Sequence, residues 1–238
     1  MTNMSLGPRP TDLSVSAAWA ACIIIYAGVM GMAAFAPSFL EGPPHDYEFG
    51  FLEQFGNVIL VVALVAMVWA IYRADSMWLR AWMILVTLGT IYVLGEEASW
   101  GQHYFHWQTT GWFASHNDQG ETNLHNTSSW FDQKPRAVLQ LGVIVGGILH
   151  PLVKRFRNGR GLFDNPWWLA PTVACLPAAL FSILAGVPKA VDKLHLLPFE
   201  LHSFRSSEFE ELFFYTFFVT YMLSLLIRLK ARRTRPAM

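Results

Sequence analysis

The sequence predicts an all-α integral membrane protein, a bundle of about six transmembrane helices forming one domain over residues 1–238. Hydrophobic residues make up 53% of the chain and charged residues only 14%, a composition typical of bilayer proteins. The long uncharged stretches also approach the roughly 20 residues that a helix needs to cross about 30 Å of hydrocarbon. We therefore expect spans at about residues 16–37, 54–72, 78–95, 137–153, 167–187 and 210–228.

The first predicted span contains Ala34-Phe35-Ala36, which has the small residues of a signal-peptide cleavage site. Its apolar run is longer than the usual stretch of about 7–15 residues in a signal peptide, and Pro37 would follow the cut. We predict a retained helix. The second and third spans follow, separated by a short connection that Arg73 and Arg80 flank.

The last three spans carry distinct local signals. The fourth is marginal in length, and its glycines Gly142, Gly146 and Gly147 permit close helix packing. The fifth contains Pro171 and Pro177, which predict a bend because proline removes a helical hydrogen bond. Before the sixth, Ser207 and Glu210 have the spacing of a capping box.

Lys and Arg predict the orientation, because short cytoplasmic loops retain them. Most lie before the first span, around the second connection, in the fourth connection and after the last span: Arg9, Arg73, Arg80, Lys154, Arg155, Arg157, Arg160, Arg228, Lys230, Arg232, Arg233 and Arg235. Both termini are therefore expected in the cytoplasm, and the protein is expected in a bacterial inner membrane. The opposite, periplasmic face would receive most of the histidines and carboxylates.

The lipid bilayer is the first expected partner. Binding to nucleic acid is not expected, because the basic residues are divided between the ends of the spans and leave no basic face for it. Assembly with further copies or with other chains stays open.

One long outer loop, at about residues 96–135, is predicted to be structured and functional, because most loops are much shorter. Its start is expected to continue the third span as helix. Glu96, Trp100 and His103 recur at i, i+4 and i+7, so they would share one helical face.

Carboxylates and histidines cluster in and around this loop. Glu96 and Glu97 stand together at a membrane surface, which is costly unless they are paired, solvated or bound to a cation. The structural alternative is an interfacial charge pair. Glu208 and Glu211 share a face at i, i+3 where the last span begins.

The segment around Glu121 and His125 allows two interpretations. In a helix their i, i+4 spacing would let both side chains hold one metal. In an extended segment, Asn117, Gln119, Glu121 and Asn123 would offer oxygens on one side, as in a calcium loop. The structural alternative is a loop whose Asn and Asp side chains satisfy its own backbone.

Carboxylates and imidazoles converging from several helices are how bundles build one- or two-metal sites. The predicted divalent ion is Zn, Fe or Mn, with Ca a poorer match. Glu96 and Glu208 are the expected catalytic proton carriers, and the expected ligands are Glu97, His103, His116, Glu121, His125 and Glu211.

The strings Glu96-Glu97-Ala98-Ser99-Trp100-Gly101-Gln102 and Asn117-Asp118-Gln119-Gly120-Glu121-Thr122-Asn123-Leu124-His125-Asn126 resemble the pattern EExSWGQ…NxQGExNLHN of a family of uncharacterised bacterial multi-span membrane proteins. The resemblance covers about thirty residues and implies no activity. A looser likeness is to the alkaline ceramidase-like membrane hydrolases, which hold zinc with His and Asp. This chain departs from them with six predicted spans rather than seven, and with Glu208 and Glu211 where they have a histidine pair.

The sequence therefore predicts a membrane-embedded, metal-dependent hydrolase or transferase that acts on a lipid or lipid-linked substrate at the outer leaflet. Three alternatives remain: a carboxylate-bridged metal oxidoreductase, an ion or proton transporter, and a non-catalytic subunit of a membrane complex. Against transport, no inverted repeat is visible and the inner face lacks a matching polar cluster.

Overall fold

The computed structural model describes residues 12–42, 49–117, 119–162, 170–197 and 205–233. Every regular element in these ranges is a helix, as predicted. Six of the helical stretches are long and apolar enough to cross a membrane: Val15–Phe35, Phe51–Arg73, Met77–Glu97, Ser129–Phe156, Val173–Lys193 and Ser206–Ala231.

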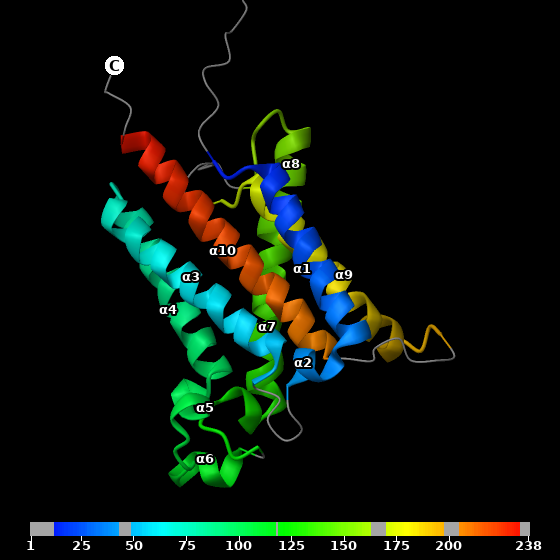
Figure 1. The fold of residues 1–238 in the computed structure, drawn as a ribbon. Coiled ribbons are helices and arrows are strands. Elements are labelled where there is room, and N and C mark those ends of the chain that lie inside the picture. The colour runs from blue at the N-terminus through cyan, green and yellow to red at the C-terminus, as the bar shows by residue number, and fades with distance from the viewer. Residues whose placement is uncertain (1–11, 43–48, 118, 163–169, 198–204, 234–238) are drawn as a thin grey trace, which may run out of the picture.

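The helix α10 (Ser206–Arg233) runs through the middle of the bundle (Figure 1). It packs mainly against α3 (Phe51–Arg73) and α9 (Leu176–Lys193), and α4 (Met77–Glu97) packs against α3. The apolar stretch of α10 is 67% buried inside the molecule, whereas that of α1 (Val15–Phe35) is 11% buried. The core is therefore built on α10, and α1 is a peripheral helix.

The buried face of α3 follows the helical period with Leu60, Ala63, Met67 and Ala70. Small residues alternate with large ones there, so the bulky side chains of α10 can approach. These are chiefly Phe209, Leu212, Phe213, Phe214, Phe217, Met222 and Leu225, all of which are buried.

The fourth span is one long helical stretch with a wider turn in its middle. It consists of α7 (Ser129–Ile144), the π-helical turn η4 (Val145–Leu149) and α8 (His150–Phe156). A Cβ on Gly147 would lie 2.5 Å from Ala179 Cβ and 2.7 Å from Phe217 Cε2. Glycine at this position is therefore what lets the span contact both α9 and α10.

We expect Gly147→Ala to destabilise the bundle by about 1–3 kcal/mol, the usual cost of overpacking a filled core. The matched control is Gly142→Ala in the same span, because a Cβ there would meet nothing within 4 Å. Thermal unfolding in detergent measures both. Equal stability of the two variants would contradict the packing described here.

The fifth span differs from its prediction at residues 167–187, part of which lies outside the described residues. The short helical turn η5 (Val173–Cys175) starts the stretch and α9 continues it to Lys193. Pro171 precedes the helix and Pro177 lies in its first turn, where its missing N–H costs nothing. Neither of these two prolines therefore interrupts the interior of α9, and the proline that does lie inside the helix is Pro188, which was expected after the span.

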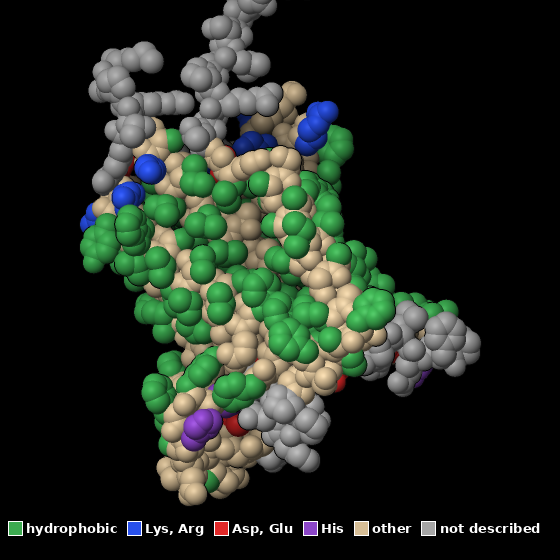
Figure 2. Space-filling model, in the orientation of Figure 1, with side chains coloured by type: hydrophobic (Ala, Val, Ile, Leu, Met, Phe, Trp, Pro, Cys, Tyr) green, Lys and Arg blue, Asp and Glu red, His purple; other side chains and the backbone are tan. Residues whose placement is uncertain are grey.

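Hydrophobic side chains cover the flanks of the helices, as a lipid-facing surface requires (Figure 2). The visible Lys and Arg side chains lie at the end of the bundle where α10 finishes, and the visible histidines lie at the other end. The short helices α5 (Gln102–Phe105) and α6 (Gly111–His116) project from this second end (Figure 1). The charge asymmetry of the sequence is thus an asymmetry between the two ends of the bundle.

Candidate functional site at the acidic end of the bundle

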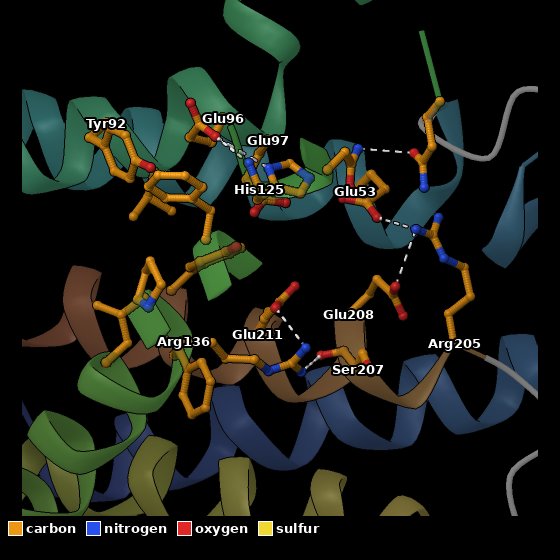
Figure 3. A pocket seen from close by; sticks show the side chains of 18 of the residues that line it. Glu53, Tyr92, Glu96, Glu97, His125, Arg136, Arg205, Ser207, Glu208 and Glu211 are labelled. Atoms are coloured by element: carbon orange, nitrogen blue, oxygen red, sulfur yellow. Dashed lines mark hydrogen bonds and ion pairs between the residues drawn. The ribbon is translucent and has the colours of Figure 1, made fainter. Parts of the chain in front are cut away.

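A cavity of about 320 Å³ opens between the first turns of α3 and α10, the last turn of α4, α7 and the loop. Carboxylates, cations and one imidazole line it: Glu53, Glu96, Glu97, Glu208, Glu211, Arg136, Lys189, Arg205 and His125. Figure 3 shows Glu96, Glu97 and His125 along one wall, with Glu208 and Glu211 facing them. Five carboxylates thus stand against three cations among the lining residues.

Two arginines tie the carboxylates of different helices together. Arg205 Nη2 lies 2.9 Å from Glu53 Oε1 on α3 and 3.2 Å from Glu208 Oε1 on α10. The pairing explains how the carboxylate of Glu53, only 8% exposed, can be buried at the start of an apolar helix.

Arg136 makes a corresponding link between α7 and α10. Its Nη1 lies 3.0 Å from Glu211 Oε1 and its Nη2 lies 3.1 Å from Glu210 Oε2. The same Nη2 donates to the Ser207 carbonyl at 2.7 Å, and Gln140 Nε2 donates to Glu210 Oε1 at 3.0 Å. Glu210 is therefore bound to another helix, so the capping box predicted with Ser207 is not its role.

Glu97 lines the cavity beside Tyr215. The hydroxyl of Tyr215 is hydrogen-bonded to Glu97 and lies within electrostatic range of Glu53 and Glu211. A Cβ on Gly56 would lie 3.2 Å from the Tyr215 ring, so glycine in α3 leaves room for it. The carboxylates of α3, α4 and α10 thus surround one tyrosine hydroxyl.

The helix α4 ends at Glu97, and the predicted continuation of this helix to His103 is wrong. Ser99 and Trp100 have positive φ values of 44° and 55°, and Gly101 has 104°. The chain therefore turns back, and Trp100 Nε1 donates to Glu96 Oε1 at 2.9 Å. Glu96, Trp100 and His103 do not share one helical face.

Glu96 anchors the returning loop to the end of α4. Its Oε2 accepts hydrogen bonds from the backbone N–H groups of Leu124 at 2.7 Å and His125 at 3.0 Å. The same oxygen lies 3.5 Å from His125 Nδ1. Glu96 thus fixes the imidazole of His125 at the cavity wall, through its backbone as well as its ring.

Glu121 organises the loop itself. Its Oε2 accepts hydrogen bonds from Asn123 Nδ2 at 2.6 Å, Asn126 Nδ2 at 2.7 Å and Ser99 Oγ at 3.2 Å. Its Oε1 lies 3.3 Å from His103 Nε2. This single carboxylate therefore joins both arms of the loop.

Asn117 completes the turn that carries Glu121. Its Oδ1 accepts from the backbone N–H groups of Gln119 at 3.0 Å and Glu121 at 3.2 Å, and its Nδ2 donates to Asn123 Oδ1 at 2.9 Å. This is the way in which Asn side chains favour turns over helix or strand. The local sequence therefore forms a loop whose Asn side chain satisfies its own backbone, which was the structural alternative, and Glu121 and His125 do not lie on one helix.

The pKa values of the two loop residues follow from these contacts. Burial opposes ionisation of Glu121, but hydrogen bonds from His103, Asn123 and Asn126 outweigh it and hold its pKa below the ordinary value. Burial also disfavours protonated His125, whereas the hydrogen bond and negative charge of Glu96 raise its pKa above the usual range.

Five of the eight predicted site residues line the cavity: Glu96, Glu97, His125, Glu208 and Glu211. The other three, His103, His116 and Glu121, are not among the described residues that line the cavity. His103 and Glu121 pair in the loop. His116 is exposed, and its ring stacks on Trp112 at a centroid distance of 4.5 Å.

The sequence interpretation missed Arg136, Lys189 and Arg205 as members of the site. The sequence offered one clue to them: only five of the seventeen Lys and Arg residues were assigned to the acidic face, so each was a candidate partner for its carboxylates.

Within the described ranges, no three His, Cys, Asp or Glu side chains stand together in a group that could hold a metal ion. Comparison of the chain with protein-family models, curated proteins and solved structures found no match.

Proposed function

We propose that this protein is a membrane-embedded, metal-dependent hydrolase or transferase that acts on a lipid or lipid-linked substrate. The observation that carries the proposal is the charge balance of the cavity, where five carboxylates meet three cations. Excess negative charge at the end of membrane helices is costly unless a cation offsets it. One divalent ion would neutralise the surplus.

Glu97, Glu211 and His125 are the residues to which we assign the metal. They come from α4, α10 and the loop and all line the cavity. His125 has a carboxylate, Glu96, beside Nδ1, the arrangement that orients metal-bound imidazoles in many proteins. Because no group of three is in place among the described side chains, binding requires Glu97 and Glu211 to rotate toward His125.

The composition of the cavity bears on the choice of ion. Carboxylates dominate its donors, with one imidazole and no thiolate. Such a set suits Mn or Fe better than Zn, which usually has more nitrogen or sulfur ligands. A bound divalent ion would lower the pKa of a water molecule and polarise an ester, amide or phosphate.

The remaining side chains bind and orient. Both oxygens of Glu96 are engaged with the loop, so we assign it to holding His125, and assign Glu208 as the proton carrier. Apolar side chains share the cavity wall with these charges: Val93, Phe131, Pro135, Leu139 and Phe214. A substrate with a polar head and an apolar chain matches this mixed lining.

We further propose that the cavity faces the periplasm of a bacterial inner membrane. The support is the placement of basic residues at the opposite end of the bundle, where the described chain begins and ends. Cysteine accessibility in intact cells tests this orientation, with one probe at the exposed Ser115 of α6 and one at the exposed Asn158 at the other end of the bundle.

The decisive experiment is elemental analysis of the purified protein and of Glu97→Gln and Glu211→Gln. The control is Glu41→Gln, which removes the same charge outside the cavity lining. We expect Mn or Fe near one equivalent in the wild type and in the control, with a loss of about tenfold or more in the two cavity variants. No metal in any sample after incubation with Mn, Fe and Zn would overturn the metal assignment.

A second measurement separates an enzyme from a subunit. Lipid extracts incubated with the metal-loaded protein should change in mass-spectrometric profile, and Glu211→Gln should abolish the change. Metal binding with an unchanged lipid profile would favour a non-catalytic role. Release of an oxidised lipid would favour the oxidoreductase alternative.

A further inference from the structure

A second cavity lies at the other end of the bundle, away from the acidic site. Its volume is about 630 Å³, and it lies between the η4–α8 part of the fourth span, the start of α9 and the end of α10. Six of its twelve described lining residues are apolar: Ile148, Pro151, Leu152, Pro171, Val173 and Leu176. The metal proposal assigns it no role.

Local helix geometry builds this cavity. The wider π-helical turn η4 precedes it, and Pro151 in the first turn of α8 has no N–H to continue the helical ladder. Opposite, a Cβ on Gly146 would lie 3.0 Å from Pro171 Cγ, so the two segments touch there. Beyond that contact the fourth span and the start of α9 are separated by the cavity.

Positive charge gathers at the cavity. Lys154 and Arg155 lie in the last turn of α8, are exposed, and line it together with Arg228 of α10. Asp12 is the one carboxylate among the described lining residues. It accepts a hydrogen bond from Ser224 Oγ at 2.6 Å and lies within electrostatic range of Arg228.

The charges divide into a buried part and an exposed part. Arg228 is 8% exposed, its Nε donates to the Ser224 carbonyl at 3.3 Å, and Asp12 offsets its charge. Lys154 and Arg155 remain as two exposed cations at the edge of an apolar hollow. A ligand that matches both features carries negative charge beside a hydrocarbon chain.

We propose that this cavity binds an anionic phospholipid of the surrounding bilayer, with one acyl chain in the apolar hollow and the phosphate at Lys154 and Arg155. Leu152 and Val173 are each 50% exposed on membrane-spanning stretches, so the hollow borders the lipid-facing surface. Juxtamembrane Lys and Arg each contribute about 1 kcal/mol to binding of anionic lipid. The lipid requires no path through water, because it enters sideways.

The test uses the full-length protein, delipidated in detergent and supplied with phosphatidylglycerol or phosphatidylcholine, with bound lipid counted by native mass spectrometry. The variant K154A/R155A should retain phosphatidylglycerol at least tenfold less well than the wild type. The matched control R157A/R160A removes two charges from the same basic stretch, outside the described lining, and should stay within about twofold.

Leu152→Trp supplies an independent arm, because it fills the hollow without changing charge. It should also lower phosphatidylglycerol retention, and it decides the matter if K154A/R155A fails to fold. Equal losses in both charge variants would show diffuse attraction and overturn the proposal. Equal retention of phosphatidylcholine would overturn it too, as would displacement of the lipid by inorganic phosphate.

Discussion

Replacing Glu121 by alanine is expected to release residues 119–127 from the end of α4 and to speed their amide exchange about a hundredfold. The carboxylate is the shared acceptor for Asn123, Asn126 and Ser99 and the partner of His103. Its loss removes the acceptor of the Ser99 hydroxyl and of one N–H each of Asn123 and Asn126, whose amides still donate to Ser99 Oγ and Gln119 Oε1. We expect a cost of about 3 kcal/mol, because each unsatisfied buried group costs roughly 1–3 kcal/mol. Hydrogen-exchange mass spectrometry of the loop peptides measures the release.

Two controls give this result its meaning. Glu121→Gln keeps one acceptor oxygen but loses the charge, so it should fall between the wild type and Glu121→Ala. His116→Ala removes an exposed side chain whose ring contacts Trp112 and Ser115 within α6, and it should leave exchange of the loop unchanged. Unchanged exchange in Glu121→Ala would show that another contact holds the loop.

Acid should act in the same direction as Glu121→Ala. The pKa of Glu121 in the folded loop is lowered, so its contribution is complete above the ordinary carboxyl value and is lost as the pH falls through the lowered one. The pKa of His125 is raised, so its pairing with Glu96 is complete below the ordinary imidazole value and is lost as the pH rises through the raised one. Protection of the loop amides from exchange should therefore be greatest at pH values above the ordinary carboxyl pKa and below the ordinary imidazole pKa.

The membrane helices were predictable because hydropathy depends on composition alone. All six predicted spans overlap helices that are long and apolar enough to cross a bilayer. The fifth was displaced because apolar residues continue on both sides of Pro171, so hydropathy gave no start point. The helix begins at Val173, after Thr172 in an extended backbone conformation, and a hydropathy window does not register such a change of backbone.

The position of the long outer loop could be predicted from the sequence, but the path of its backbone could not. The spacing of Glu96, Trp100 and His103 favoured a helix, yet two non-glycine residues, Ser99 and Trp100, adopt positive φ. That conformation costs energy locally, and the bonds from Trp100 and from the loop amides to Glu96 compensate for it. Such compensation involves residues almost thirty positions apart, which no local pattern contains.

The acidic cavity shows the same limit. Its carboxylates were recognisable as costly groups at helix ends, but Arg136 and Arg205 were not identified as their partners. Each arginine joins helices that are distant in sequence, as Arg136 does with Glu210 and Glu211. Charge type could therefore be predicted from sequence, and charge pairing required the packing of α7 and α3 against α10.

Replacing Arg136 by methionine is the second large change, expected to cost about 3–5 kcal/mol of stability. The substitution keeps much of the apolar stem and leaves Glu210 and Glu211 without their shared cation at a largely buried position. Arg136→Lys should recover only part of the loss, because an ammonium cannot bridge two carboxylates as a guanidinium does. Thermal unfolding and urea unfolding in detergent measure the ranking.

The control is Lys134→Met, which removes the same charge two residues earlier from an exposed position on α7. It should change stability by less than about 0.5 kcal/mol. Adding Glu210→Gln to Arg136→Met should restore stability, since it removes one of the two carboxylates that lost their partner. If Lys134→Met loses as much stability as Arg136→Met, overall charge stabilises this end of the bundle and the specific ion pairs do not. If Glu210→Gln fails to restore stability, packing of the Arg136 stem contributes more than its charge.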